Sequence, residues 1–402
     1  MEFGIAMPSP SSTLIENFEP QDQVFEQPFS ILREAIARQS FPAASIAVTH
    51  RGQLVAREAL GHFAYKSGIA TTGDIAPGAP SFSRPLREGG DFEVQSSTLF
   101  DLASLTKVVA TTPMAMLLYE RGLLDLDAPV SAIVPEFIHD AENDPRRQEV
   151  TLRMLLSHSS GLPAYEKLYL KSRTRDELLQ AAIRMPLAAN PATKAVYSDI
   201  GFIILGIALE RLADESLDRF CQREIFAPLS MTGTTFNPPT EIRAQIPPTA
   251  DDQTFRKRII QGEVQDENAF ILGGVAPQAG LFSTAEDLAK FAHAMLNEGR
   301  PIFRPGTVSL FTRRESAPPG TSRALGWDTP SAPSQSGKYF SPKSFGHLGY
   351  TGTSLWIDPV RQLSITLLTN RTWPDCSNQA IKQVRPEFHD AAIEALESPD
   401  SD

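Results

Sequence analysis

A serine and a lysine three residues apart form the strongest chemical signal in this sequence. They are Ser104 and Lys107, within the stretch 100–107 (Phe-Asp-Leu-Ala-Ser-Leu-Thr-Lys), where a long helical pattern begins. At this spacing both side chains lie on one face of a helix, one turn apart. A lysine amine held against a serine hydroxyl can create a nucleophile without histidine, although Ser-x-x-Lys alone also occurs by chance in many helices.

Two more motifs, far along the chain, could complete such a site. Tyr197 begins a Tyr-Ser-Asp turn directly before a very apolar helical segment. Residues 346–352 (Gly-His-Leu-Gly-Tyr-Thr-Gly) precede a strand-like run, and a glycine-rich edge segment can bind an extended substrate and donate a backbone N–H. A helix that begins at Ser104 also points its first N–H groups towards a developing oxyanion. The three motifs together indicate a catalytic serine far more strongly than any one of them does.

The periodicity of apolar residues predicts the elements that position these motifs. Strand-like runs at both ends of the chain form two hairpins, 44–58 and 353–368. Helical patterns occur at residues 25–38, 104–121, 150–158, 175–185, 200–212, 220–227, 284–297 and 386–396. Pro113 is expected to kink or interrupt the helix that starts at Ser104. The order favours an α/β (α+β) fold, with an antiparallel sheet from both termini, flanking helices and an inserted, mostly helical domain.

A division into domains follows from this order of elements. Residues 1–24 are rich in Pro, Ser and Glu and are expected to be a mobile lead-in. Residues 25–98 and 270–402 are expected to form the sheet domain, residues 99–269 a mainly helical domain, and the active site their interface. The Gly- and Pro-rich segment 65–94 is interpreted either as the rim of the site or as a disordered insertion.

Composition and charge argue against several classes of partner. The 402 residues carry 37 Lys+Arg against 48 Asp+Glu, and the net charge of −11 disfavours a nucleic acid or an anionic membrane surface as the main partner. Cys221 and Cys376 have no metal-ligand spacing, and neither a metal nor a cofactor is expected. No secretory signal is visible and no run reaches the ~20 apolar residues of a spanning helix. A cytoplasmic location is therefore expected, or a periplasmic or extracellular one if a leader has been removed; the sequence leaves the oligomeric state open.

Five segments together carry a resemblance to a known family. They are residues 100–107, residues 155–163 (Leu-Leu-Ser-His-Ser-Ser-Gly-Leu-Pro), the Tyr-Ser-Asp turn at 197–199, His-Leu-Gly at 347–349, and Gly273-Gly274 followed by Gly-Leu-Phe-Ser-Thr at 280–284. With them, the chain from about residue 27 to residue 370 resembles the serine β-lactamase and penicillin-binding protein superfamily. The closest branch holds class C β-lactamases, β-lactamase-like carboxylesterases and D-alanyl-D-alanine carboxypeptidases. The resemblance implies a β-lactamase/transpeptidase-like fold.

The resemblance also implies a role for each motif residue. Ser104 would be the acylated nucleophile, and Lys107 would take its proton, which requires a neutral amine part of the time; burial and nearby cations favour that form. Tyr197 would shuttle the proton to the leaving group. Backbone N–H groups of Ser104 and Tyr350 would form the oxyanion hole. His347 would position the carboxylate or carbonyl side of the substrate, or tune Tyr197.

The chain departs from the family pattern at several positions. Asp199 stands where the family carries the asparagine of Tyr-x-Asn, and a carboxylate there disfavours an anionic group close by. Gln265 and Gln278 stand where relatives often carry histidine. Gly349 belongs to the edge segment that would contact the substrate. His158 is expected to be a structural residue at a helix end.

These residues predict a serine hydrolase that cleaves an ester or amide through a covalent acyl-enzyme on Ser104. Carboxylesterase-like or D-amino-acid peptidase-like activity on a small molecule or peptide ranks above true β-lactamase activity, because Asp199 opposes the carboxylate of a β-lactam. Two alternatives stay open. One is a β-lactamase, and the other is a penicillin-binding or sensor module that is acylated without turnover.

Overall fold

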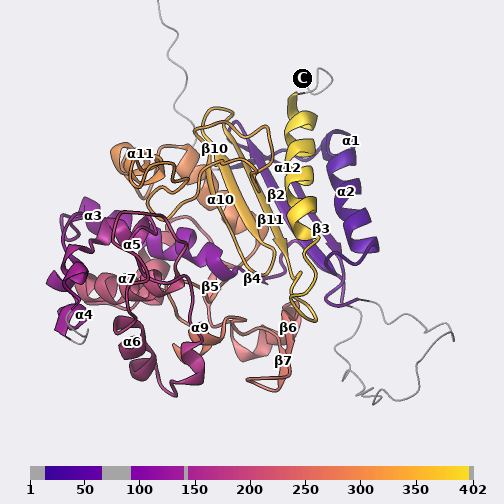
Figure 1. Cartoon of the computed structure of the whole chain (residues 1–402). Helices are drawn as coiled ribbons and strands as arrows, with labels where there is room; N and C mark the ends of the chain where they lie inside the picture. Colours follow the sequence, from indigo (N-terminus) through magenta and orange to yellow (C-terminus); the bar gives the residue numbers. More distant parts are fainter. Residues whose placement is uncertain (1–13, 66–91, 140–143, 398–402) are drawn as a thin grey trace, which may run out of the picture.

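A six-stranded sheet built from both ends of the chain organises the fold in the computed structural model (Figure 1). The structure describes residues 14–65, 92–139 and 144–397. The strand order is β1 (Ile15–Glu16), β3 (Gln53–Gly61), β2 (Ala43–His50), β11 (Leu363–Thr369), β10 (Ser354–Asp358) and β9 (Phe345–Leu348). All neighbours are antiparallel except β1 and β3. The predicted antiparallel sheet from both termini is therefore confirmed, and the two-residue strand β1 adds one parallel pairing at its edge.

The chain before the first hairpin also differs from expectation. The N–H groups of Ile15 and Asn17 bond to the carbonyls of Gly52 and Leu54, and helix α1 (Gln21–Val24) follows. This part of the expected lead-in joins the sheet because the edge of β3 offers unpaired backbone groups. Residues 1–13 of the expected lead-in lie outside the described residues.

Alternate side chains of the strands enter two different cores, as the two-residue period of a strand requires. In β2, Ile46 packs in the core that includes residues of α2 (Glu26–Ala37) and α12 (Ile381–Glu397). Its neighbour Ala47 lies in the core that includes residues of α10 (Ala285–Leu296). Because helices cover both faces, β10 and β11 are buried along their whole length (Figure 1).

Helix α12 begins at Ile381 and not at the predicted Pro386. A proline inside a helix lacks the N–H that would bond to the carbonyl four residues earlier, here that of Lys382. The side chain of Gln335 donates to this carbonyl at 3.1 Å. The helix therefore continues through the proline without leaving that acceptor unpaired.

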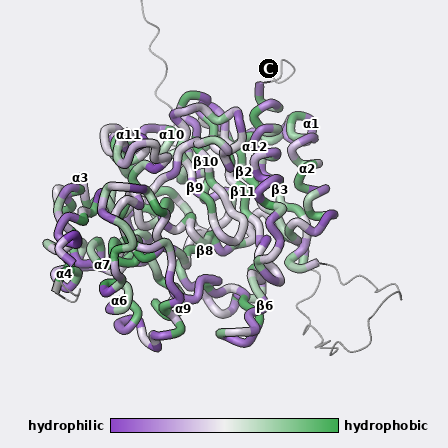
Figure 2. The backbone as a smooth tube through the Cα atoms, viewed as in Figure 1, coloured by the Kyte–Doolittle hydropathy of each residue, from purple (hydrophilic) through white to green (hydrophobic). Residues whose placement is uncertain are grey.

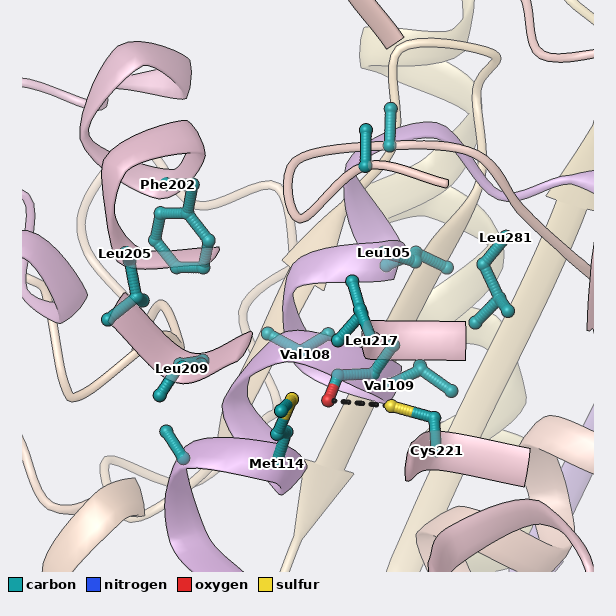
Figure 3. Packing of buried hydrophobic residues seen from close by; sticks show 14 of the residues in the cluster. Leu105, Val108, Val109, Met114, Phe202, Leu205, Leu209, Leu217, Cys221 and Leu281 are labelled. Atoms are coloured by element: carbon teal, nitrogen blue, oxygen red, sulfur yellow. Dashed lines mark hydrogen bonds between the residues drawn. The ribbon is translucent and has the colours of Figure 1, made fainter. Parts of the chain in front are cut away.

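The middle of the chain is mainly helical and packs beside the sheet (Figure 1). Its elements are β4 (Phe100–Asp101), α3 (Thr112–Glu120), α4 (Glu136–His139), α5 (Leu152–Leu156), α6 (Arg175–Ile183), α7 (Asp199–Ala213), α8 (Leu217–Cys221), β5 (Thr235–Phe236), β6 (Ala250–Asp252), β7 (Arg258–Ile260), α9 (Glu267–Ile271), β8 (Leu281–Ser283) and α11 (Pro305–Thr312). Leu105 and Val108 meet Phe202 and Leu205 of α7 in one apolar cluster (Figure 3). Hydrophilic residues gather on the outer loops and helix faces, and hydrophobic residues lie between the elements (Figure 2).

The segment predicted as one helix from Ser104 to Arg121 is helical but changes type along its length. A 3-10 turn (Ala103–Leu105) leads into a wider π-type turn (Lys107–Thr111) and then into α3. Pro113 lies in the first turn of α3, where its missing N–H leaves no carbonyl of α3 unpaired. The helix thus changes type directly before Pro113 but is not interrupted there. π-type turns of this kind occur often at functional sites.

Within the described residues, no helix has both the length and the apolar character to cross a membrane. Most of the segment 65–94, which was interpreted as a rim or an insertion, lies outside the described residues. Cys221 is buried, Cys376 is exposed, and both thiols are free.

Candidate active site

A sharp turn directly after β4 delivers Ser104. The Asp101 carboxylate accepts the N–H of Ala103 at 2.8 Å and the N–H of Gln265 at 2.7 Å. Ala103 has φ of +47°, a left-handed conformation that is uncommon for a residue with a side chain. Burial raises the pKa of Asp101 to about 6, although both N–H groups act to lower it. Asp101 thus ties the strained turn to a second loop.

Three predicted residues meet around the Ser104 hydroxyl. The Nζ atom of Lys107 lies 3.0 Å from Ser104 Oγ, and the Tyr197 hydroxyl donates to the same oxygen at 2.8 Å. Lys107 is fully buried, and its Nζ atom lies 4.8 Å from the centroid of the Tyr197 ring. Ser104 therefore lies within hydrogen-bond reach of two titratable groups.

Lys107 has two further partners that sequence reasoning did not assign to it. Its Nζ atom donates to the backbone carbonyl of Gln278 at 3.0 Å and lies 2.7 Å from Oδ1 of Asp199. The Lys107 ammonium therefore donates to Ser104 and Gln278 and forms an ion pair with Asp199. Asp199 thus pairs with the buried cation, and its charge is balanced within the site.

The pKa of Lys107 departs from expectation. Burial alone would lower the pKa of Lys107, but the Asp199 carboxylate and Tyr197 oppose burial and the net shift is upward. The expectation of a readily neutral amine is wrong, because it counted burial and cations but no paired carboxylate. Burial also raises the pKa of Tyr197, against the Lys107 ammonium that lowers it. The resting site therefore holds an ammonium and a neutral phenol.

The Tyr-Ser-Asp turn is held by the end of the segment 155–163, which follows helix α5. Ser198 caps α7 by accepting the N–H of Gly201 at 2.9 Å, and it donates to the carbonyl of Pro163 at 2.6 Å. The backbone N–H of Ser198 donates to Nδ1 of His158 at 3.1 Å. Burial holds the pKa of His158 well below its usual range, so the ring is neutral and accepts this bond. His158 thereby positions Tyr197 without contact with the nucleophile.

His347 lies on the edge strand β9, with its ring centroid 5.7 Å from that of Tyr197. Burial first, and then the nearby Lys107 and Arg323 cations, hold the pKa of His347 well below its usual range. Its Nδ1 lies 2.7 Å from the carbonyl of Leu348, which can only accept, so Nδ1 carries the proton. Nε2 is then a bare acceptor, and it is buried without a hydrogen-bond partner among the described residues. In this form His347 offers an acceptor, and not a donor, through Nε2.

The segment after β9 is fastened to the nucleophile turn. The hydroxyl of Thr351 donates to the carbonyl of Asp101 at 2.7 Å, and that of Thr353 donates to the carbonyl of Leu102 at 3.0 Å. A Cβ atom at Gly349 would collide with both the Leu102 carbonyl and Thr353, so only glycine permits this approach. The Tyr350 side chain is half exposed. The proposed oxyanion-hole donor thus follows a glycine that lies directly against the Ser104 turn.

Sequence reasoning missed four contributors. The Gln278 carbonyl is a backbone group and carries no residue signature. Thr351 lies in the glycine-rich segment 346–352 and Thr353 directly follows it, but no role was given to either hydroxyl. Arg323 was missed as well, although its guanidinium carbon lies 5.5 Å from the Tyr197 ring centroid. The two threonines at positions 351 and 353, in and directly after the glycine-rich segment, were the one signal in the sequence for these hydroxyl contacts.

Comparisons with known proteins identify the family of this chain. A family model described as Beta-lactamase matches residues 29–385. An N-acetylmuramyl-L-alanine amidase of Bacillus subtilis (strain 168) is 33% identical over 360 residues, which cover 82% of this chain and 77% of that protein. A protein of Escherichia coli (strain K12) provisionally named D-alanyl-D-alanine carboxypeptidase is 34% identical, with 69% of this chain and 70% of that protein covered.

A solved structure shares the fold at low identity. It is EstCE1, described as a hydrolase with promiscuous acyltransferase activity, with a TM-score of 0.72 and 20% identity over 92% of this chain and 99% of that chain. The serine–lysine–tyrosine geometry, the fold and the match over most of the chain lead to one conclusion. The chain belongs to the β-lactamase family of serine hydrolases, which cleave esters or amides through an acyl-enzyme.

Proposed function

We propose that this enzyme uses Ser104 as its nucleophile to hydrolyse an amide bond in a small peptide that contains a D-amino acid, and that it also accepts activated esters. The observation that carries the proposal is the position of Ser104 Oγ between Lys107 Nζ at 3.0 Å and Tyr197 Oη at 2.8 Å. A hydroxyl placed between two groups that can exchange protons is suited to attack a carbonyl and to protonate the leaving group in turn.

In the proposed acylation, Ser104 Oγ forms a bond to the substrate carbonyl carbon and gives its proton to the Lys107–Tyr197 pair. The backbone N–H groups of Ser104 and Tyr350 stabilise the oxyanion. The C–N or C–O bond then breaks, and Tyr197 returns the proton to the leaving amine or alcohol. A water molecule attacks the acyl-enzyme by the reverse sequence, releases the acid and restores the Ser104 hydroxyl.

The proton acceptor follows from the charges around Lys107. With Lys107 as an ammonium and Tyr197 as a phenol, neither group can take a proton. The trio of Ser104, Lys107 and Tyr197 must first lose one proton. Because the pKa values of Lys107 and Tyr197 are both raised, the fraction of enzyme that has lost this proton and can react grows as pH increases. Once that proton is lost, the ammonium of Lys107 stabilises the Tyr197 phenolate, which lies within a cation–π distance of it. We propose Tyr197 as the immediate base.

Support for the substrate class comes from the relatives. One relative is named as an amidase of a muramyl–alanine bond and another, provisionally, as a D-alanyl-D-alanine carboxypeptidase. Both names describe cleavage of an amide in a small peptide unit. The solved neighbour named as a hydrolase with acyltransferase activity supports acceptance of esters. The pairing of Asp199 with Lys107 at 2.7 Å removes one objection to an anionic substrate, because that carboxylate is already neutralised.

We also propose that the site lies between two domains, residues 99–269 and the remainder of the chain from residue 25. Ser104, Lys107 and Tyr197 come from the first, and His347 and Gly349 come from the second. The hydroxyl bonds of Thr351 and Thr353 to carbonyls of the nucleophile turn support a shared site at this boundary.

A substrate panel tests the proposed function. Wild type and Ser104→Ala are compared on p-nitrophenyl esters, nitrocefin and D-alanyl dipeptides and tripeptides. The expected result is hydrolysis of a D-alanyl peptide and of short esters, with loss of about 10³-fold or more in Ser104→Ala. Hydrolysis of nitrocefin without action on D-alanyl peptides favours the β-lactamase alternative. Hydrolysis that survives in Ser104→Ala contradicts the nucleophile assignment. Labelling by a β-lactam without any turnover favours the sensor alternative instead.

A further inference from the structure

One buried residue joins Asp266 to the lysine beside the nucleophile. The side-chain amide of Gln278 donates to Oδ1 of Asp266 at 3.4 Å. The backbone carbonyl of the same Gln278 accepts from Lys107 Nζ at 3.0 Å. Gln278 is only 1% exposed. The carboxyl of Asp266 therefore lies in the environment of Lys107 without touching the reacting atoms.

The segment that carries Asp266 is held firmly in place. Oδ1 of Asp266 accepts the N–H of Ala269 at 2.6 Å and so caps α9. In the same helix, the side chain of Asn268 accepts the N–H of Tyr169 at 2.9 Å and donates to the carbonyl of Glu166 at 2.9 Å. Because the carboxyl is fixed, a change in its charge acts on neighbouring charges at a constant distance.

The hydrogen bonds around Gln278 suit an Asp266 carboxyl that can carry a proton. Oε1 of Gln278 is buried and has no hydrogen-bond partner among the described residues. A buried acceptor of this kind costs free energy unless a group donates to it. An ionised carboxyl can only accept, whereas a protonated one is also a donor. The amide that Asp266 already contacts thus offers an acceptor to the protonated form.

The charges around Asp266 favour that proton near neutral pH. Burial is the largest cause that raises the pKa of Asp266 to about 7, followed by the Asp199 carboxylate. The N–H of Ala269 and the Lys107 ammonium act in the opposite direction. The titratable and charged groups that surround it are Asp199 of α7, Glu267 of α9, Lys107 of the π-type turn, Tyr165 and Tyr169 of the segment before α6, and Arg256, which binds the carbonyl of Gln265.

We propose that Asp266 is a positioning residue for the proton transfer from Ser104, and that it acts through Lys107. Its contact with the Gln278 amide helps to hold the carbonyl that binds Nζ. As an acid, Asp266 leaves Asp199 as the carboxylate that balances Lys107. As a carboxylate, it adds a second negative charge that favours the ammonium further. The proposal rests on the proposed function, in which the Lys107–Tyr197 pair takes the Ser104 proton.

The pH profile of kcat/KM for p-nitrophenyl acetate separates this role from a capping role. Asparagine caps a helix about as well as aspartate, so Asp266→Asn keeps the cap and removes the charge. Asp266→Ala removes both. Asp144→Asn is the matched control, because Asp144 also caps a helical turn, by accepting the N–H of Arg146 at 3.1 Å. Thermal melting of each variant reports the state of the fold.

We expect Asp266→Asn to move the rising limb of the profile to lower pH. Above about pH 7 the wild-type carboxylate holds the proton on Lys107, and the asparagine does not. The displacement should be about 0.5–1 pH unit, less than the 1–3 units caused by a charge in direct contact. Asp266→Ala should move the limb in the same direction and also lower Tm, and Asp144→Asn should leave it in place. A limb that coincides with that of wild type in Asp266→Asn, or lies at higher pH, overturns the proposal.

A second measurement does not depend on turnover. Ser104→Ala is labelled with ¹³C at the side-chain carboxyl carbons of aspartate, and the Asp266 resonance is identified by its loss in Ser104→Ala/Asp266→Asn. It should titrate near pH 7, and at lower pH in Ser104→Ala/Asp199→Asn, because the Asp199 carboxylate raises the pKa of Asp266. Titration at the usual aspartate pKa of about 4, or a titration that Asp199→Asn does not move, overturns the proposal.

The two proposals fail in different ways. If wild type hydrolyses no ester or peptide while the Asp266 resonance titrates near pH 7 and responds to Asp199→Asn, the proposed function fails and the coupling of the two carboxyls stands. If wild type hydrolyses its substrates in a Ser104-dependent manner while Asp266→Asn keeps the wild-type pH profile, the catalytic assignment stands and the role of Asp266 is wrong.

Discussion

The Nζ atom of Lys107 lies 2.7 Å from the Oδ1 atom of Asp199, in a place where the family motif provides an asparagine. A neutral amide would leave the buried lysine to the effect of desolvation, which favours the amine. The carboxylate instead favours the ammonium, and the net pKa shift of Lys107 is upward. The carboxylate at this motif position thus opposes the effect of burial on the pKa of Lys107.

Asp199→Asn should move the pH dependence of the enzyme. The Asp199 carboxylate raises the pKa of Lys107, so its removal lowers that pKa and lets the trio lose its proton at lower pH. We expect the rising limb of kcat/KM for a p-nitrophenyl ester to move down by about 1–3 pH units, the usual effect of one close opposite charge. Asp127→Asn, which removes an exposed carboxylate paired with Arg153, should leave the limb in place. An unmoved limb, or one displaced to higher pH, contradicts the account.

His158 should prove to be structural. Replacement by alanine leaves the Ser198 N–H without its acceptor and opens a cavity beside the Tyr197 ring, which lies 4.7 Å away by centroids. We expect a loss of about 1–3 kcal/mol in the free energy of unfolding, measured by urea denaturation. His158→Asn offers a side-chain oxygen in place of Nδ1 and should recover part of that loss. A variant that keeps full stability but loses turnover would show a direct catalytic role.

Asp101 should make stability depend on pH. Its pKa is raised from 3.8 to about 6 in the folded protein because it is buried. A group with a raised native pKa contributes stability below its unfolded pKa, and that contribution is lost as pH rises through about 6. The free energy of unfolding of wild type relative to Asp101→Asn should therefore fall by about 3 kcal/mol between pH 3.5 and pH 7.5, since one pKa unit corresponds to ~1.4 kcal/mol. A difference that is flat over this range excludes the titration of Asp101.

Much of the frame could be predicted from local pattern. The helical patterns at 150–158 and 284–297 correspond to α5 and α10, which Thr151 and Thr284 cap through their hydroxyls. The hairpins at both ends followed from alternating apolar residues and turn residues, and they meet in one sheet. Ser104, Lys107 and Tyr197 could be grouped because each belongs to a motif of recognisable residue types, and they lie within hydrogen-bond distance of one another.

The remaining features depend on contacts that no local pattern encodes. The Gln278 carbonyl reaches Lys107 across 171 positions of sequence, and a backbone oxygen has no residue identity to recognise. The protonation state of Lys107 depends on whether the Asp199 carboxylate outweighs the effect of burial. That balance depends on the distance between the Lys107 and Asp199 side chains, which the sequence does not give. β1 could not be placed because a two-residue strand has no period. Arg323 reaches Tyr197 only through the fold of the sheet edge.

The most direct test of the central claim is the mass of the protein during turnover. Wild type is mixed with a p-nitrophenyl ester, quenched in acid after less than one turnover, and examined by intact-protein and peptide mass spectrometry, with Ser104→Ala and Ser159→Ala as controls. We predict that one acyl group is found on the peptide that contains Ser104 in wild type and in Ser159→Ala, and that it is absent from Ser104→Ala. Turnover with no acyl group on Ser104, or an equal amount of acyl group on Ser104→Ala, would contradict the account.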